Sequence, residues 1–478
     1  MFQLAFACRS ISTALLTPNV RITAAVELLR QAKANWSMTA FLSDTYQTMD
    51  LLRFITCGSV DDGKSTLIGR LLYDSDSVSL DVLATLEKRG SSNGGAVDLA
   101  LLTDGLKAER EQGITIDVAH KYFTTPRRKF IITDAPGHVQ YTRNMVTGAS
   151  NADLAIVLVD ARQGVIEQTR RHTLLASLLG IKYFVLAVNK MDLVGNDEAV
   201  FERIKADYQL VAEQLRLPHV IAIPLSALNG DNVVRPSRNL PWYGGPSLLQ
   251  HLESVPVAAD ANPHEARFQV QYVIRPQTEA LPDYRGYAGS IQSGSYRVGD
   301  KVRIHPSGVE TVLEAIEVNQ QPVPSAEAPQ AVVLRLRDDV DVSRGDAIVP
   351  VTAHPAVVRE LEATLCWMDE RPLKAGRKLL VQHHAALVKA SVTAILQKTN
   401  IETFESVGTD EAKLNDIVRV RLRTALPLVA DAYRANRATG AFILVDEQTG
   451  NTLAAGLIQA TDPEYFTQEV PVEPAFSI

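Results

Sequence analysis

The feature that most limits what this chain can fold into is a glycine-containing loop between two apolar segments. Residues 51–57 (LLRFITC) form a short apolar run suited to a buried strand. Residues 58–66 read GSVDDGKST, and a segment with helical apolar spacing, LIGRLLYDS, follows them. This is G-x-x-x-x-G-K-S between a strand and a helix, where backbone N–H groups and a helix N-terminus surround phosphate oxygens. The loop therefore predicts a nucleotide-binding α/β domain.

Two side chains of this loop have specific predicted roles. Lys64 reaches the β- and γ-phosphates, and the Ser65 hydroxyl holds Mg²⁺. The remaining loop residues are expected to contribute backbone groups or close packing. The predicted nucleotide contacts are Gly58, Ser59, Val60, Asp61, Asp62, Gly63, Lys64, Ser65 and Thr66.

A second apolar run, residues 129–133 (KFIIT), ends in the sequence DAPGH. A carboxylate at the end of such a strand, Asp134, can hold Mg²⁺ through water, and the Gly137 N–H can meet a γ-phosphate. This segment alone is also a common kind of turn, because a glycine follows a proline. The residues expected at the nucleotide are Asp134, Ala135, Pro136, Gly137 and His138.

A third apolar run, residues 183–188, ends in Asn189, Lys190, Met191 and Asp192. The Asp192 carboxylate can accept two hydrogen bonds from the N1–H and N2–H₂ edge of guanine. Adenine lacks both donors and would leave a desolvated carboxylate unpaired, at a cost of a few kcal/mol. We expect Asn189 to touch the opposite edge of the base and the Lys190 stem to lie on its face. After a fourth run, residues 220–225, a backbone N–H of Ser226, Ala227 or Leu228 is expected to meet the guanine O6.

A polar segment between the loop and the second run reads REQGITID over residues 110–117. A threonine there, Thr115, can place its hydroxyl on Mg²⁺ only while a γ-phosphate is present, which makes the segment a switch. Read alone, it could equally be an ordinary polar loop. The five segments together, in this order at strand ends, predict a GTPase with Mg²⁺ as cofactor and GTP as substrate.

The motifs GSVDDGKST, EREQGITID, DAPGH, NKMD and SAL resemble those of the translation-factor GTPases, the superfamily of elongation factor Tu. The resemblance implies that Thr115 is the switch threonine and that His138 positions the attacking water, so that His138, Lys64 and Thr115 carry catalysis. Translation factors usually have histidine where this chain has Asp62. The stretches LLTDGLKAEREQGITIDVAHKYF, GHVQYTRNMVTGAS and PWYGGPSLL resemble a narrower family, the GTPase (large) subunit of the two-subunit bacterial sulfate adenylyltransferase.

Beyond the predicted GTPase domain, short alternating runs separated by Gly, Pro and Asp turns are typical of β-barrels. We expect an α/β P-loop GTPase domain followed by two β-barrel domains, which the resemblance also implies. The expected divisions are an N-terminal extension (1–50), for which disorder is one reading, the GTP-binding domain (51–257), barrels at 265–352 and 356–460, and a C-terminal tail (461–478). The natural start is expected at Met38 or Met49.

Charge and cysteine content restrict the partners and the compartment. The chain has 48 basic and 55 acidic residues, and proteins that neutralise nucleic-acid phosphates usually have a basic excess. No run approaches the ~18 apolar residues that a membrane span needs. Three cysteines do not predict a disulfide framework. We therefore expect a cytoplasmic protein that binds neither nucleic acid nor membrane.

The resemblance implies that GTP hydrolysis is coupled to the formation of adenosine 5′-phosphosulfate and pyrophosphate from ATP and sulfate, in sulfate assimilation and cysteine biosynthesis. Adenylyl transfer is expected on a partner, the small catalytic subunit, in a heterodimer or higher assembly, because the chain has no S-G-G-x-D-S loop for ATP. Two alternatives stay open: a translation elongation factor-type GTPase, and a regulatory GTPase without coupled chemistry. Fused members carry a C-terminal kinase, and the chain has no second G-x-x-x-x-G-K-[ST].

Overall fold

A computed structural model describes residues 49–75, 77–78, 99–102, 117–138, 142–256, 265–276 and 283–460. The N-terminal extension before residue 49, the C-terminal tail and Thr115 lie outside these ranges. The first folded part contains strands β1 (Leu51–Cys57), β2 (Ala119–Thr124), β3 (Lys129–Asp134), β4 (Leu154–Asp160), β5 (Tyr183–Asn189) and β6 (His219–Pro224). Its helices are α3 (Lys64–Asp74), α6 (Thr142–Ala149), α7 (Glu167–Leu178), α8 (Glu198–Gln214) and α9 (Leu248–Ser254), with short 3₁₀ helices η2 (Leu99–Leu102) and η4 (Met191–Val194).

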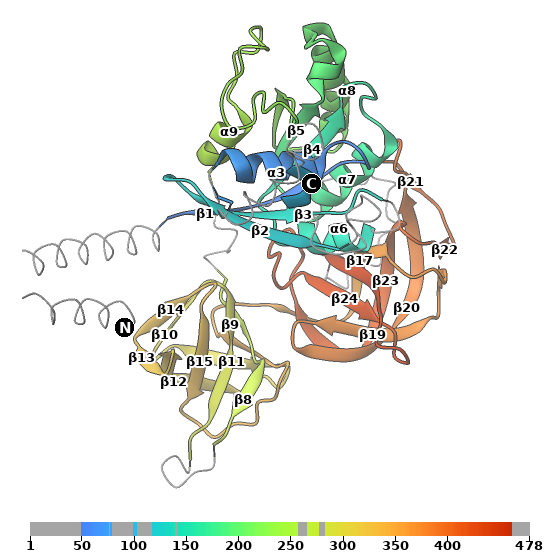
Figure 1. Cartoon of the computed structure of the whole chain (residues 1–478). Helices are drawn as coiled ribbons and strands as arrows, with labels where there is room; N and C mark the ends of the chain where they lie inside the picture. The colour runs from blue at the N-terminus through green and yellow to red at the C-terminus, as the bar shows by residue number, and fades with distance from the viewer. Residues whose placement is uncertain are drawn as a thin grey trace, which may run out of the picture. The chain divides into compact units, whose positions relative to one another are not determined.

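These strands form one six-stranded sheet in the order β2-β3-β1-β4-β5-β6 (Figure 1). The pairs β1–β4, β4–β5 and β5–β6 are parallel. Strands buried on both faces are nearly continuous apolar runs, and β4 (LAIVLVD) is buried at every position. Parallel strands end at the same edge of a sheet, so the polar residues that follow each apolar run are brought together.

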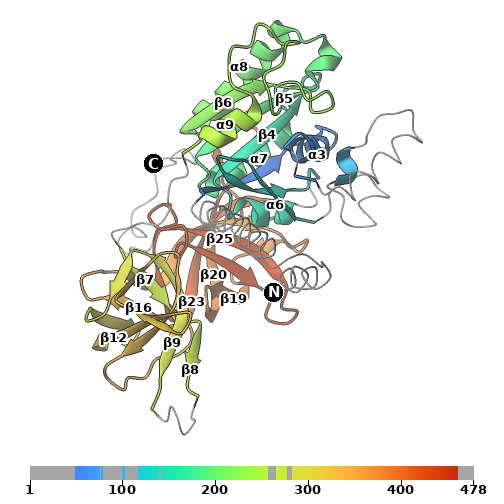
Figure 2. The ribbon, with the colours of Figure 1, turned by 60° about the vertical axis from the view of Figure 1, so that its left-hand side comes forward.

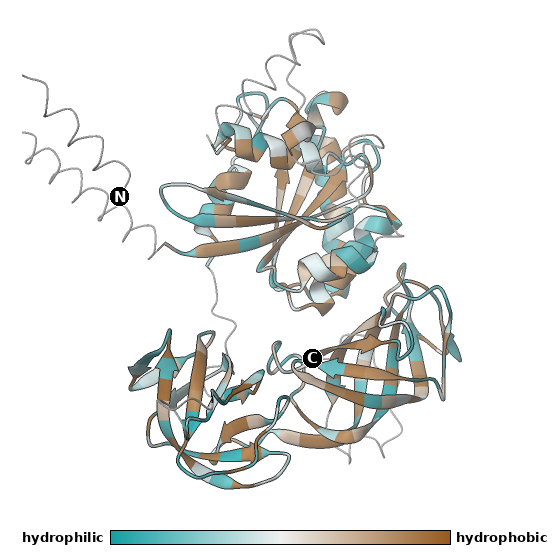
Figure 3. Ribbon diagram, turned by 60° about the horizontal axis from the view of Figure 1, so that its bottom comes forward, coloured by the Kyte–Doolittle hydropathy of each residue, from teal (hydrophilic) through white to brown (hydrophobic). Residues whose placement is uncertain are grey.

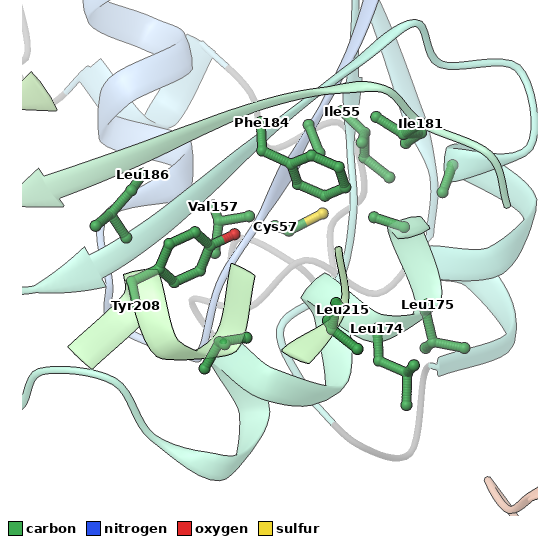
Figure 4. Packing of buried hydrophobic residues seen from close by; sticks show 14 of the residues in the cluster. Ile55, Cys57, Val157, Leu174, Leu175, Ile181, Phe184, Leu186, Tyr208 and Leu215 are labelled. Atoms are coloured by element: carbon green, nitrogen blue, oxygen red, sulfur yellow. The ribbon is translucent and has the colours of Figure 1, made fainter. Parts of the chain in front are cut away.

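Helices cover both faces of this sheet (Figure 2). On one face, side chains of α6, α7 and α8 pack on β1, β4 and β5, and Figure 4 shows Leu174, Tyr208 and Phe184 of this core around the Cys57 thiol. Burial raises the pKa of Cys57 to about 12, so the thiol is a packing group. On the other face, α3 and α9 pack on β1, β3, β4, β5 and β6.

The second folded part is a β-barrel. Its strands are β7 (Arg267–Gln269), β8 (Tyr272–Ile274), β9 (Gly286–Ser293), β10 (Ser295–Arg297), β11 (Lys301–His305), β12 (Glu310–Val318), β13 (Gln321–Val323), β14 (Ser325–Glu327), β15 (Ala331–Leu336) and β16 (Ala347–Pro350). The order β11-β16-β7-β9-β15-β12 closes on itself because β11 also pairs with β12. Buried residues alternate with exposed or half-buried ones along β11 and β15, as a barrel wall requires.

The third folded part is also a closed barrel. Its strands are β17 (Ala356–Trp367), β18 (Leu373–Lys374), β19 (Lys378–His383), β20 (Ala386–Thr399), β21 (Ser406–Val407), β22 (Glu411–Ala412), β23 (Ile417–Ala430), β24 (Ala441–Val445) and β25 (Thr452–Ala460). The order β19-β24-β25-β17-β23-β20 closes through the pairing of β19 with β20. Figure 3 shows the mixture of hydrophobic and hydrophilic positions along these strands. The expected architecture, an α/β domain followed by two β-barrels, is confirmed.

Among the described residues, 49–51 and Thr125–Lys129 belong to one compact unit. Within it, the Lys129 N–H donates to the Asp50 carbonyl (3.0 Å), and Arg128 pairs with the Asp50 carboxylate (3.6 Å). Across the described ranges, none of the helices has both the length and the apolar composition needed to cross a bilayer.

Candidate nucleotide-binding site

The predicted motifs lie at the carboxyl edge of the six-stranded sheet. The loop of residues 58–63 joins β1 to α3, Asp134 ends β3, and Asn189 ends β5. In the β4–β5 ladder, Asp160 is the register partner of Asn189, so the ends of adjacent strands are level. Ligands of open α/β sheets bind in this position, outside the carboxyl ends of the strands.

The loop is held in its turn by two contacts that depend on the residue type. Gly63 has φ +92°, and a Cβ there would lie 2.4 Å from the Asn189 Nδ2, so only glycine fits. The Asp62 carboxylate accepts a hydrogen bond from the Ser59 N–H. Because Gly63 is the N-cap of α3 and has no side chain, the first N–H groups of the helix have no side-chain cap. The N-terminus of α3 can therefore bind an anion through these N–H groups.

Lys64 lies inside the curve of this loop. Its ammonium group is buried and donates to the Gly58 carbonyl (3.1 Å) and the Ser59 carbonyl (2.7 Å). Burial lowers the pKa of Lys64, against the opposing charges of Asp134 and Asp62. A Cβ on Gly137 would lie 2.6 Å from the Lys64 Nζ, so the glycine of the DAPGH motif sits directly against the loop. The structure therefore brings two predicted phosphate contacts together.

Asn189 links three segments of the site. Its Nδ2 donates to the Asp62 carbonyl (2.7 Å), and its Oδ1 accepts from the Ala227 N–H (2.9 Å). The side chain is buried and joins the end of β5 to the phosphate loop and to the segment after β6. The structure thus gives Asn189 a bracing role, and its predicted contact with the base stays a prediction.

The segment of residues 226–228 offers one backbone donor more readily than the others. The Ser226 N–H donates to the Asp231 carbonyl (3.2 Å), and the Ala227 N–H donates to Asn189. The Leu228 N–H has no acceptor in the part of the chain that the structure describes. The Leu228 side chain is 63% exposed, and Arg70 donates to the Leu228 carbonyl. Of the three predicted donors to guanine O6, the Leu228 N–H is thus the one that the described contacts leave available, and its pairing with the base stays a prediction.

Lys190 and Met191 are fixed in different ways. Met191 is fully buried, so it contributes packing to the site. Lys190 has φ +62°, and its ammonium group donates to the Asp61 carbonyl and pairs with Asp160 (3.0 Å). The Asp192 carboxylate, half-buried on η4, accepts no hydrogen bond from the described residues. It is therefore available for the predicted pairing with a base.

Asp160 is a residue of the site that was not predicted from the sequence. This residue ends β4 and holds both Lys190 and Arg162, the latter at 2.6 Å. Burial alone would raise the pKa of Asp160, but the hydrogen bonds from Arg162 and Lys190 outweigh burial and lower it. The signal that could have found it is a carboxylate at the end of the most apolar run in the domain, in line with Asn189 and Asp134.

The predicted Mg²⁺ ligands fit that ion in part. Asp134 is buried and accepts a hydrogen bond from the Thr56 hydroxyl (3.3 Å), which orients its carboxylate, and Ser65 is half-buried in the first turn of α3. Within the described ranges, no cluster of three or more His, Cys, Asp and Glu residues could hold a metal. One hydroxyl and one carboxylate, completed by water and phosphate oxygens, are the oxygen donors that Mg²⁺ commonly takes at a nucleotide. His138 is half-buried beside Gly137.

Comparison with known proteins agrees with this geometry. Residues 49–317 match the family described as the elongation factor Tu GTP binding domain, and residues 360–459 match the one described as GTP-eEF1A C-terminal domain-like. Sulfate adenylyltransferase subunit 1 of Laribacter hongkongensis is 51% identical over 425 residues, which are 87% of this chain and 87% of that protein. The chain belongs to the sulfate adenylyltransferase subunit 1 family. The protein of that name from Bacteroides fragilis is likewise 51% identical, over 88% of both chains.

A second kind of relative is longer. The bifunctional enzyme CysN/CysC of Mycobacterium tuberculosis is 53% identical over 411 residues, which are 85% of this chain and 67% of that protein. The expected membership of the sulfate adenylyltransferase GTPase subunits, within the elongation factor Tu-like GTPases, is confirmed. Asp62 is thus compatible with this family, and in the structure its carboxylate closes the loop onto Ser59.

Asp160→Asn should reduce the stability of this sulfate adenylyltransferase subunit 1 family member, and the size of the reduction should depend on pH. Because the folded-state pKa of Asp160 lies below its ordinary value, its contribution is fully present above about pH 4 and is lost as the pH falls through the folded pKa. We expect Asp160→Asn to lower the free energy of unfolding by about 1–3 kcal/mol at pH 7. Urea unfolding at pH 7, 5 and 3 should show this difference narrowing only at the lowest pH.

Asp207→Asn on the exposed surface of α8 is the matched control and should change the free energy of unfolding little at any of these pH values. An Asp160→Asn protein as stable as the parent at pH 7 would show that the pairing with Lys190 and Arg162 contributes nothing.

Proposed function

We propose that this chain is the GTP-hydrolysing subunit of a sulfate adenylyltransferase. It couples hydrolysis of GTP to the formation of adenosine 5′-phosphosulfate and pyrophosphate from ATP and sulfate. The observation that carries the proposal is the convergence of loop 58–63, Gly137 and Asn189 at one sheet edge, in a chain that covers most of the relatives named for this activity.

The proposed binding mode uses groups that are already positioned. Lys64 donates to two loop carbonyls, and exchanging these for the β- and γ-phosphate oxygens keeps a buried ammonium group hydrogen-bonded. The N–H groups of the first turn of α3 add an aligned dipole end. Asp192 and the Leu228 N–H then select guanine, with the Lys190 stem on the face of the base.

The oxygen donors of Ser65 and Asp134 suit Mg²⁺. When bound, the ion would neutralise charge on the phosphate oxygens. Ser65 and Thr115 would hold it, with Asp134 acting through water; Thr115 lies outside the described residues. Within the chain, His138 orients the hydrolytic water, and Gly137 beside it carries the contact with the γ-phosphate. We propose that the switch segment and the barrels transmit the nucleotide state to the partner.

We place adenylyl transfer on the small catalytic subunit, bound to this chain in a heterodimer or a higher assembly. The formation of adenosine 5′-phosphosulfate is strongly uphill, and a linked GTP hydrolysis would supply a driving force for it. A soluble, cytoplasmic assembly is consistent with the acidic balance and with the unpaired, buried Cys57 and Cys366.

The coupled reaction can be tested directly. The chain is purified together with the small subunit, and sulfate-dependent release of pyrophosphate from ATP is measured with GTP, GDP or a non-hydrolysable GTP analogue. We expect stimulation by GTP alone, because coupling needs the hydrolysis step and not occupancy of the site. The control is the same complex with the Lys64→Met chain, in which pyrophosphate release is measured in the absence of GTP hydrolysis.

The two other functions predict different results. A regulatory GTPase would bind GTP and the small subunit yet leave pyrophosphate release unchanged. A translation elongation factor would bind tRNA with a steep salt dependence, which a gel-shift experiment detects. Stimulation by GTP together with no shift of tRNA separates the proposed function from both.

A further inference from the structure

Two buried polar residues of α7 lie directly behind the phosphate loop and have no role in the mechanism above. Gln168 and His172 are one helical turn apart, so their side chains lie on the same face of the helix. The Gly58 N–H donates to the His172 Nδ1 (3.1 Å), and the Gln168 Nε2 lies 3.1 Å from the Gly137 carbonyl oxygen. The pair therefore touches both the phosphate loop and the glycine that faces it.

The hydrogen bond from Gly58 fixes the tautomer of His172. Burial lowers the pKa of His172 to about 3, and the positive charges of Lys64 and Arg171 act in the same direction, so the ring is neutral. A neutral imidazole has one N–H donor and one acceptor. Since Nδ1 accepts from Gly58, the single ring proton is on Nε2, and it points away from the loop.

Gln168 cannot satisfy both of its neighbours at once. Its Nε2 lies 2.8 Å from the His172 Nε2 and 3.1 Å from the Gly137 oxygen. In this orientation the amide donates to Gly137 but sets a second donor against the His172 N–H. If the amide turned over, its oxygen would accept from His172 but would oppose the Gly137 carbonyl. Each orientation makes one hydrogen bond and leaves one group without a partner, which is costly in a buried site.

Binding of a γ-phosphate would change which orientation of the Gln168 amide is favoured, because Gly137 is packed closely against the phosphate loop and Lys64. A Cβ on Gly137 would lie 2.6 Å from the Lys64 Nζ and 2.9 Å from the backbone of Ser59 and Val60. A phosphate group bound between Lys64 and the Gly137 N–H must move this glycine off the loop. The Gly137 carbonyl then moves away from Gln168. The hydrogen bond that favours the present orientation of the Gln168 amide is lost.

We propose that Gln168 is a positioning residue whose side-chain amide turns over between the Gly137 carbonyl and the His172 ring when Gly137 takes up a γ-phosphate. GDP and GTP then have different hydrogen bonds behind the phosphate loop, and Gln168 adjusts how readily the chain exchanges one state for the other. The inference rests on the proposed nucleotide site and names a determinant of its preference between the two nucleotides.

Two substitutions of Gln168 separate this arrangement from a simple anchor. The carboxylate in Gln168→Glu can accept from His172 but repels the Gly137 carbonyl, so of the two hydrogen-bond arrangements it disfavours the one without a γ-phosphate. Gln168→Met has a similar shape and loses both hydrogen bonds, so its effects on the two states cancel. We expect the ratio of affinities for a non-hydrolysable GTP analogue and for GDP to rise about five-fold or more with Glu and to change less than about two-fold with Met.

Affinities are measured with fluorescent nucleotides on the full chain, and Gln163→Glu, the same change at an exposed site, is the control. An equal rise with Glu and Met would show that Gln168 only anchors Gly137, and an unchanged ratio with Glu would exclude any role in nucleotide preference. Either result overturns the inference. If the parent chain binds neither nucleotide, the proposed function itself fails.

A second measurement on the unsubstituted chain does not depend on the variants folding. The His172 Nε2–H signal is identified in ¹⁵N-histidine-labelled protein by its loss in His172→Gln. We expect it to shift downfield and to exchange more slowly with the GTP analogue, because the proton then has an oxygen acceptor. The same signal with both nucleotides would overturn the proposal.

Discussion

Replacement of Lys64 by Met should abolish GTP hydrolysis while leaving the chain folded. The ammonium group lies inside the loop, where it can contact the β- and γ-phosphates and the charge that develops as the phosphoryl group transfers. Removing a donor aimed at developing charge typically costs about 10²–10³ in rate, and binding is weakened in addition. We expect GTPase activity to fall by about 10³ or more.

The stability of the Lys64→Met variant separates a catalytic role of the lysine from a structural one. Methionine, of similar length, removes the cost of the buried charge of Lys64, whose pKa burial lowers, but it leaves the Gly58 and Ser59 carbonyls without their donor, so we expect a change in stability much smaller than the change in activity. Phosphate release measures the loss of activity, and urea unfolding measures the stability. Lys205→Met on α8, where the lysine is half-exposed and pairs with Glu202, should change neither quantity appreciably. A Lys64→Met chain that lost both activity and fold would place the lysine in the structure rather than in catalysis.

Asp192→Asn should exchange the base preference from guanine to xanthine. In the proposed binding mode the carboxylate accepts two hydrogen bonds from the guanine edge, whereas an amide at this position would set a donor against the guanine amino group and would suit the xanthine oxygen. Leaving such buried groups opposed costs a few kcal/mol, so we expect at least about a hundred-fold loss of GTP affinity and a gain for xanthosine triphosphate.

Competition binding with GTP, xanthosine triphosphate and ATP tests this prediction. The carboxylate of Asp192 lies on the short helix η4, and no hydrogen bond to the described residues would be lost in the substitution. The fold should therefore be unaffected. The exposed Asp207→Asn again serves as the control. Undiminished GTP affinity in Asp192→Asn would move base recognition to another residue.

The parts of the fold and site that were predictable are those that depend on local pattern. The runs before Gly58, Asp134, Asn189 and Ser226 are all strands, because uninterrupted apolar segments of this length are typical of a parallel sheet covered on both faces. The change to alternating runs similarly predicted barrels. Strands of two or three residues, such as β18 and β22, carry too little sequence pattern to be found.

What could not be predicted depends on contacts between distant segments. The motif around Asn189 predicted a base contact, but only the folded chain shows its amide bonded to Asp62, 127 positions away. Gln168 and His172 look like ordinary polar residues of a helix until the tertiary structure brings them to Gly137 and Gly58. Asp160 is similar, since its partner Lys190 follows the neighbouring strand β5 and does not lie in its own segment.

Asn189 has a consequence for how this site can be altered. Its two amide atoms tie the phosphate loop to the segment that carries the Leu228 N–H. We expect a substitution of Asn189 to alter both phosphate binding and base selectivity. Asp192 takes no part in this connection, so a substitution there should alter base selectivity alone. We therefore expect that nucleotide preference can be redesigned from η4, whereas a substitution at position 189 would not alter phosphate binding or base choice independently.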